Sequence, residues 1–455
     1  MLIRCAEVWQ HGLADVRISG GVISEIGFLE PRGSELVVNA RGGALLPGLH
    51  DHHIHMAASA ARAQSVVCGP PEVSTADELA SLLSIQGDGW LRGILYHESV
   101  MGLPDARELD RICPDRPLRI QHRSGRMWLL NSRALDLLLA NASSPPGLER
   151  LNGQFSGRLF EEDGWLQNAM QAQPPSLAGI SAELARFGVT GITDMSPRND
   201  AAIANWFASE HQEGRLRQRC ILAGTLSLAE AVPSPHWKIG AAKLHLHENA
   251  LPDFDDFVAV IRAAHAQGRC VASHGTTETE LVFTLATLDA AGIMPGDRIE
   301  HAGIARDDHV TMIAEMGLSV VSQPHFIAER GDQYLADVAP DLHAVLYRLA
   351  SFLRVGVTLA AGSDAPFGSL DPWAAMAAAA SRKTASGRII GAEEALSPEQ
   401  ALELFLSDPA DLSRQRAIGI GSAADLCLLD CPWHEMSLSL DSGHVAATII
   451  AGELV

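Results

Sequence analysis

Hydrophobic and polar residues alternate with a period of two near both ends of the chain. The alternating runs are residues 2–4, 14–18, 22–26, 424–430 and 444–450. Gly20-Gly21 joins two of these runs, which is typical of a β-hairpin. Because chain termini often lie close together, the pattern predicts one small composite β-sandwich domain built from residues 1–43 and 419–455.

Between the two ends, short hydrophobic runs alternate with segments of helical periodicity, as in a parallel sheet built from βα units. Eight runs are predicted as strands: residues 44–53, 189–194, 218–224, 240–246, 269–274, 297–301, 318–323 and 357–363. Residues 253–268 show the 3.6-residue period of a helix that ends at a glycine. The pattern predicts an α/β fold, a (β/α)8 TIM barrel over residues 44–418, with residues 65–180 as an insertion or lid subdomain after the first strand.

Composition and charge exclude several classes of protein. Of the 455 residues 47% are hydrophobic and 20% charged, which is ordinary for a globular protein and excludes a disordered chain. Lys plus Arg number 34 against 55 for Asp plus Glu, a net charge of −21, which argues against nucleic acid or an anionic membrane as a partner. No hydrophobic stretch reaches the roughly 20 residues of a membrane helix, and the first ten residues lack the features of a signal peptide. We therefore expect a cytoplasmic protein with a small-molecule substrate, and a homodimer as the default assembly.

The seven cysteines are scattered along the chain, and no pair has the spacing of a zinc finger. Cys427 and Cys431 are too isolated to make a site. The cysteines are expected to be reduced thiols, mainly in the core.

Four of the nineteen histidines fall within residues 50–55, at the end of the first predicted strand. Catalytic groups of a barrel lie at the C-terminal ends of its strands. His53 and His55 are two residues apart and project to the same side of an extended chain, so they can chelate one metal ion. Asp51 is expected to lie on the same side and to orient them. His50 and His52 are equally consistent with ordinary histidines of a polar loop.

Lys243 lies inside the fourth predicted strand, on the same face as His245 and His247. A charged lysine is costly to bury, so it must be paired, neutralised or modified. Carbamylation by CO₂ would convert the amine into a carboxylate-like group that can bridge two metal ions. Pairing with Glu248 or another acid is the alternative.

His274, His301 and Asp364 close three further predicted strands. Together with His53, His55 and Lys243 they form a set of nitrogen and oxygen donors at equivalent strand ends. Such a set suits a hydrolytic site with one or two metal ions, for which Zn²⁺ is the default.

These residues resemble the amidohydrolase superfamily, and specifically amidohydrolase family 3, the branch that includes N-substituted formamide deformylases. The motifs that carry the resemblance are Pro47-Gly48-Leu49-x-Asp51-x-His53-x-His55, Lys243, His274, Arg298-Ile299-Glu300-His301-Ala302 and Gly362-Ser363-Asp364-Ala365-Pro366. The resemblance covers essentially the whole chain and extends to segments of the insertion, such as Tyr96-His97-Glu98-Ser99 and His122-Arg123-Ser124-Gly125. The motifs are specific to the superfamily and much less so to the substrate.

The resemblance implies that His53, His55 and Asp364 hold a first metal ion, that His274 and His301 hold a second, and that carbamylated Lys243 bridges them. The expected ions are Zn²⁺, with Mn²⁺ or Co²⁺ as alternatives. It further implies a metal-activated hydroxide that attacks a carbonyl carbon, with Asp364 as general base and then acid. The predicted reaction is hydrolysis of a C–N bond, other than a peptide bond, in an amide, formamide or cyclic amide.

Substrate contacts are expected from the insertion and from other strand ends, because loops over a rigid barrel carry specificity. The candidates are His97, Glu98, His122, Arg123, Asp194, His245, Gln323 and His325. Asp194 would serve equally well as a cap for the segment that follows it. Arg123 suits a substrate carboxylate or a structural salt bridge, and Trp128 suits the local core better than a substrate platform.

Three other functions fit parts of this pattern. A deaminase of a nitrogen heterocycle usually works with one metal ion and lacks the bridging lysine, so Lys243 argues against it. An esterase or lactonase would use the same attack on a carbonyl group, and the sequence does not separate it from an amidase. A non-enzymatic scaffold would be expected to have lost metal ligands, whereas all six positions are filled here.

Overall fold

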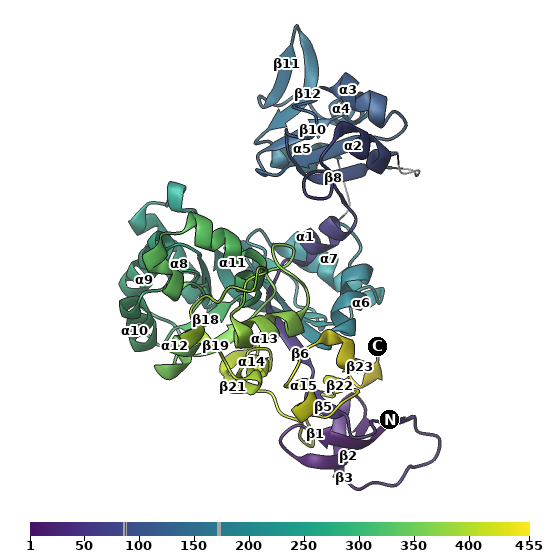
Figure 1. The fold of residues 1–455 in the computed structure, drawn as a ribbon, viewed down its shortest axis with the longest axis vertical. Helices are drawn as coiled ribbons and strands as arrows, with labels where there is room; N and C mark the ends of the chain where they lie inside the picture. The colour runs from purple at the N-terminus through teal and green to yellow at the C-terminus, as the bar shows by residue number, and fades with distance from the viewer. Residues whose placement is uncertain (85–86, 88, 171–173) are drawn as a thin grey trace. The chain divides into compact units, whose positions relative to one another are not determined.

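The computed structural model describes residues 1–84, 87, 89–170 and 174–455 (Figure 1). The chain divides into two compact units, one of Met1–Met56 with Ser176–Val455 and one of Ala57–Pro175. Within the described residues, no helix is both long enough and hydrophobic enough to cross a membrane. The two units are described separately below.

Eight parallel strands form the barrel of the first unit and follow one another in chain order. They are β6 (Leu49–Ile54), β13 (Val189–Asp194), β14 (Arg219–Gly224), β15 (Trp237–Leu244), β16 (Val271–Gly275), β17 (Arg298–His301), β18 (Ser319–Ser322) and β19 (Leu359–Ala361). Backbone hydrogen bonds at their C-terminal ends close the ring between β19 and β6. The Asp364 amide donates to the His53 carbonyl at 2.6 Å, and the His55 amide donates to the Ala365 carbonyl at 2.9 Å. The predicted (β/α)8 barrel is confirmed, and its closure places Asp364 beside His53.

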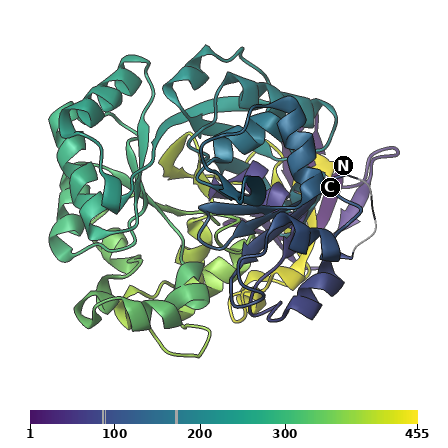
Figure 2. The same ribbon diagram turned by 90° about the horizontal axis from the view of Figure 1, so that it is seen from above.

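Helices in the connections between these strands surround the barrel, as the view from above shows in teal and green (Figure 2). They are α6 (Ala178–Arg186), α7 (Ala201–Gln212), α8 (Phe254–Ala266), α9 (Glu278–Ala291), α10 (Asp307–Glu315), α11 (His325–Asp337) and α12 (Ala350–Arg354), followed after β19 by α13 (Pro372–Ser381) and α14 (Pro398–Glu403). Helix α8 shows why the sequence folds this way. Asp253 caps its first turn by accepting hydrogen bonds from two backbone amides, and Phe257, Ile261 and Ala264 form its buried face.

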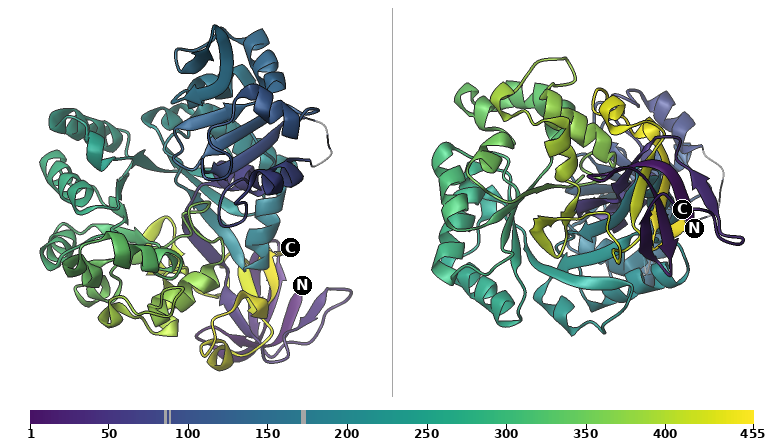
Figure 3. Two further views of the ribbon diagram at one scale, coloured as in Figure 1. Left: turned by 45° about the horizontal axis from the view of Figure 1, so that its top comes forward. Right: turned by 90° about the horizontal axis from the view of Figure 1, so that it is seen from below.

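Both ends of the chain enter one eight-stranded sheet, seen as purple and yellow strands side by side in Figure 3. Its strands are β1 (Leu2–Val8), β2 (Gly12–Ser19), β3 (Val22–Gly27), β4 (Val37–Asn39), β5 (Ala44–Pro47), β22 (Leu426–Leu429), β23 (Val445–Ile450) and β24 (Glu453–Leu454). Alternate residues such as Val16, Leu45 and Leu426 form its hydrophobic core. The strands predicted at both ends of the chain thus lie in one hydrogen-bonded sheet, in which β4 pairs with β1 beside the main path of strands. Two small elements, the hairpin of β20 (Ser407–Asp408) with β21 (Asp411–Gln415) and helix α15 (Trp433–Met436), complete the unit.

The prediction of one strand over residues 44–53 is wrong, because two strands divide this segment. β5 pairs with β1 and β22 in the terminal sheet, whereas β6 begins the barrel. At Gly48, between them, a Cβ atom would lie 2.2 Å from the Thr190 side chain, so this close approach requires glycine. The hydrophobic pattern could not show the break, because buried residues continue without interruption through both strands.

The second unit contains a six-stranded sheet in the order β11-β12-β10-β9-β8-β7. Its strands are β7 (Val66–Val67), β8 (Leu91–Tyr96), β9 (Leu118–His122), β10 (Met127–Leu130), β11 (Leu148–Leu151) and β12 (Gln154–Phe160), and its helices are α1 (Met56–Ala63, which begins in the first unit), α2 (Ala76–Leu83), α3 (Ala106–Ile112), α4 (Ser132–Asn141) and α5 (Asp163–Met170). Trp128 is buried in one of its hydrophobic clusters, and its indole N–H donates to Asp163 at 2.9 Å. Trp128 is therefore a core residue, as its sequence context favoured.

Candidate active site

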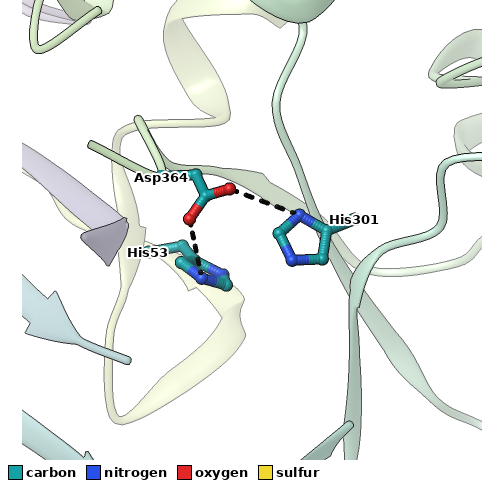
Figure 4. Close-up of side chains that lie close together, drawn as sticks. All are labelled: His53, His301 and Asp364. Atoms are coloured by element: carbon teal, nitrogen blue, oxygen red, sulfur yellow. Dashed lines mark ion pairs between the residues drawn. The ribbon is translucent and has the colours of Figure 1, made fainter. Parts of the chain in front are cut away.

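Two histidines and one aspartate meet at the C-terminal ends of the barrel strands (Figure 4). His53 comes from β6, His301 ends β17 and Asp364 follows β19, and their ligand atoms lie within 4.8 Å of one another. His53 Nε2 is 3.4 Å from Asp364 Oδ1, and His301 Nδ1 is 4.0 Å from Asp364 Oδ2. All three residues are buried. Two imidazoles and a carboxylate are a donor set that Zn²⁺ commonly binds.

The backbone at this site is held in an unusual conformation. His301 has a φ of 73° and Asp364 a φ of 50°, both in the left-handed region that non-glycine residues rarely adopt. Such conformations persist where surrounding contacts enforce them, and they concentrate at functional sites. Asp51 supplies two of these contacts, because Oδ1 accepts the amides of His53 and Ser363 at 3.0 Å each. Asp51 therefore joins β6 to the loop after β19, whereas the sequence had suggested that it orients the imidazoles.

The site extends along a row of six imidazoles in which neighbouring ring centroids lie 4.5–5.3 Å apart. In spatial order they are His55, His53, His301, His274, His245 and His247. His55 Nε2 also lies 3.0 Å from Asp364 Oδ1. The structure thus brings His55 and His274 next to the central three residues, and exposed His245 and His247 continue the row beyond the predicted ligands.

Burial keeps the central histidines neutral. It lowers the pKa of His53 and His301 well below the ordinary value and that of His274 to about 3, and the charge of Lys243 adds to each shift. A neutral imidazole retains a lone pair that can bind a cation. These three histidines are therefore in the protonation state that metal binding requires.

Lys243 lies at the end of β15 with its amine buried. Its Nζ has no hydrogen-bond partner among the described residues. Burial lowers its pKa to about 8, although the charges of Glu300 and Asp364 partly oppose this effect. The alternative partner Glu248 instead accepts a hydrogen bond from Thr279 at 2.9 Å. An unpartnered buried amine beside neutral imidazoles fits a group that is modified or that binds a ligand.

Glu300 is a site residue that sequence reasoning missed. Its Oε2 lies 2.5 Å from His53 Nδ1, and its Oε1 accepts a hydrogen bond from Arg298 Nε at 2.6 Å. With Nδ1–H donating to this carboxylate, His53 directs the lone pair of Nε2 towards Asp364. The available signal was the alternation in Arg298-Ile299-Glu300, which places both charged residues on the same face of a buried strand.

Gln323 and His325, two of the candidate substrate contacts, are both buried. Gln323 Oε1 accepts a hydrogen bond from His301 Nδ1 at 2.7 Å, and His325 Nε2 lies 2.9 Å from the Ser363 carbonyl. Helix α11 begins at His325, directly after β18, so no long loop carries these side chains outward. Gln323 positions His301, and His325 contacts the loop that carries Asp364. A role of either residue in substrate binding stays a prediction.

Asp194 caps the segment that follows it, which was the alternative to a contact with the substrate. Its carboxylate accepts hydrogen bonds from the Met56 amide at 2.7 Å, the Ser196 amide at 2.9 Å and the Asn199 side chain at 2.8 Å. Ser196 Oγ in turn lies 3.3 Å from His55 Nδ1. Asp194 therefore supports the loop beside His55.

The candidates in the insertion form a cluster within the second unit. His122 Nε2 lies 2.9 Å from Glu98 Oε2, and His97 Nε2 lies 3.6 Å from the same oxygen. Arg123 is exposed and forms no salt bridge within the described ranges. Their role in substrate binding stays a prediction.

Comparison with known proteins shows the family. Residues 36–455 match the sequence model described as "Amidohydrolase family". The chain belongs to the amidohydrolase family. The predicted resemblance and the predicted enzyme class, a hydrolase of this family, are confirmed.

Individual amidohydrolases match over nearly their full lengths. The chain is 25% identical to N-substituted formamide deformylase of Arthrobacter pascens, over 91% of this chain and 89% of that protein. It is 23% identical to the putative amidohydrolase YtcJ of Bacillus subtilis, over 97% and 95%. An uncharacterized metal-dependent hydrolase from Pyrococcus horikoshii has the same fold, with a TM-score of 0.77, 19% identity and 98% of both chains covered.

Proposed function

We propose that this amidohydrolase hydrolyses a C–N bond in an amide, formamide or cyclic amide, with divalent metal ions bound at the imidazole row. The observation that carries the proposal is the buried, unpartnered amine of Lys243 beside neutral His53, His301 and the Asp364 carboxylate. A purely structural role would leave this amine buried without a hydrogen-bond partner.

The donor set suits two ions. His53, His55 and Asp364 would hold one ion and His274 with His301 the other, while Lys243, carbamylated by CO₂, would join them. Zn²⁺ is the expected metal, and Mn²⁺ or Co²⁺ would accept the same nitrogen and oxygen donors. When bound, the metal would lower the pKa of a water molecule and polarise the substrate carbonyl.

Residues of the chain itself hold the site and move the proton. Asp364 takes the proton that the attacking water loses and transfers it to the leaving nitrogen as the C–N bond breaks, giving an acid and an amine. Glu300 holds His53 and Gln323 holds His301, each through Nδ1. These contacts fix the imidazoles before the substrate arrives, so little reorganisation is needed during the reaction.

A substrate screen with the metal-replete enzyme tests the proposal. The panel would contain N-formyl and N-acyl amines, cyclic amides, nitrogen heterocycles, esters and lactones, and its formamides are suggested by the named relative from Arthrobacter pascens. We expect turnover of at least one amide-type substrate, with loss after chelation and recovery on adding Zn²⁺. Turnover of esters or lactones alone, or release of ammonia from a heterocycle alone, would overturn the proposal.

Replacing Glu300 tests how His53 is held. Glu300→Ala is expected to lower metal affinity or activity by about 10- to 100-fold, because the hydrogen bond to His53 Nδ1 is lost. Glu300→Gln should lose less, since an amide oxygen can still accept that hydrogen bond. Metal titrations of both variants, with circular dichroism to verify folding, measure the difference. Equal losses in the two folded variants would show that charge, and not orientation, is the contribution of Glu300.

A further inference from the structure

A second group of metal-binding side chains lies in the terminal sheet, outside the barrel strands. Asp430 and Cys431 follow β22, His444 directly precedes β23, and one ligand atom of each lies within 4.8 Å of the others. His444 Nδ1 is 2.8 Å from Asp430 Oδ1. The spacing of the cysteines gave no hint of this group, because His444 comes from a separate segment.

The backbone around this group is tied down on both sides. The Asp430 amide donates to the His444 carbonyl at 2.9 Å, and Leu429 pairs with Val445 in the antiparallel ladder. The Ala44 amide donates to the Cys431 carbonyl, also at 2.9 Å, which anchors the backbone of Cys431 to the start of β5. The three residues therefore lie directly beside paired strands, which limits how far their backbones must move to bind one ion.

Negative charge surrounds the Cys431 thiol, which is buried. The carboxylates of Asp430, Glu435 and Glu7 lie close enough to act on it electrostatically. Glu7 is fixed here because its Oε2 accepts the Trp433 amide at 2.7 Å. Such a negatively charged surrounding favours a cation.

We propose that Asp430, Cys431 and His444 form a second metal site, for a thiophilic divalent cation of the Zn²⁺ type. A thiolate sulfur, an imidazole nitrogen and a carboxylate oxygen are ligands that Zn²⁺ accepts, with water in the fourth position. The bound ion would crosslink the end of β22 to the start of β23, next to β5, and so act as a clamp on this part of the sheet. Since β5 continues through Gly48 into β6, the clamp would act on the strand that carries His53. Metal binding at this second site does not rest on the reaction proposed for the barrel.

Cobalt titration of the reduced full-length protein distinguishes this site from the barrel site. A near-ultraviolet sulfur-to-cobalt charge-transfer band requires a thiolate ligand, whereas the barrel ligands offer only nitrogen and oxygen. We expect the band to saturate at one equivalent bound through sulfur, to vanish in Cys431→Ser, and to persist in Cys5→Ser, a matched control with an exposed thiol.

A second variant guards against misfolding of Cys431→Ser. His444 is partly exposed, and His444→Ala should weaken the cobalt affinity measured from this band by at least about tenfold. His434 is exposed, and His434→Ala should leave that affinity unchanged. Absence of the band in the wild-type protein, or its persistence in Cys431→Ser or at full affinity in His444→Ala, would overturn the proposal.

Discussion

Asp364→Asn is expected to lower kcat by a factor on the order of 10² to 10⁴, the usual contribution of a general acid–base group. The side-chain amide of the new asparagine cannot take the proton that the attacking water loses. It also has no acidic proton to give to the leaving nitrogen. The side chain keeps its size, so the loop closed by the Asp364 amide and the His53 carbonyl should retain its structure. Steady-state kinetics on the best substrate of the screen, with metal content measured in parallel, checks the result.

Asp371→Asn is the matched control for this variant. Asp371 caps α13 by accepting the Trp373 and Ala374 amides, and asparagine caps helices about equally well. Its activity should equal that of the wild type. A folded, metal-loaded Asp364→Asn enzyme with more than about a tenth of wild-type kcat would assign the proton transfer to another group.

Lys243→Met is expected to abolish most activity and yet to stabilise the metal-free protein. Burial shifts the pKa of Lys243 from 10.5 to about 8, which corresponds to about 3 kcal/mol of destabilisation while the amine is charged. Methionine fills a similar volume without a charge. Urea unfolding of the metal-free protein at neutral pH measures the gain, and the metal-loaded variant should bind at least one ion fewer than the wild type.

The destabilisation by Lys243 should depend on pH. The folded chain releases the Lys243 proton near pH 8 and the unfolded chain near pH 10.5, so the unfolded state binds more protons between these values. The contribution of Lys243 to the free energy of unfolding therefore rises as pH increases across this interval. Below pH 8 the amine is charged and its full destabilising effect is present. The stability difference between wild type and Lys243→Met should shrink as pH rises from 8 to 10.5. A difference that stays constant with pH would contradict this explanation.

Lys238→Met provides the control, because Lys238 is exposed on the same strand β15. It should leave activity and stability close to those of the wild type. The chain has only three lysines, Lys238, Lys243 and Lys383, so a ¹³C carbamate signal from labelled CO₂ can be assigned with few variants. We expect this signal in the metal-loaded wild type and in Lys238→Met but not in Lys243→Met.

The central residues of the candidate site could be predicted because two simple regularities coincide at them. A buried parallel strand reads as a hydrophobic run, and the polar residue that ends it lies on the catalytic side of a barrel. His53, Lys243, His301 and Asp364 each follow this rule, and the structure places His53, His301 and Asp364 together.

The supporting residues could not be predicted in the same way, because their roles depend on contacts between distant strands. Glu300 faces His53 from a strand that is far away in sequence, and Gln323 reaches His301 from the next strand of the barrel. The break at Gly48 depends on Thr190, which no local pattern of hydrophobic residues reveals. Sequence periodicity thus locates strand ends but not the neighbours that meet there.

The hydrogen bonds that close the barrel between β6 and β19 have a consequence for synthesis on the ribosome. His53 emerges early and Asp364 late, so a nascent chain that ends before residue 364 holds several imidazoles of the site but lacks the Asp364 carboxylate. Contacts of such long sequence separation form slowly in folding. The group of His53, His301 and Asp364 is therefore assembled only when nearly all of the barrel has been translated.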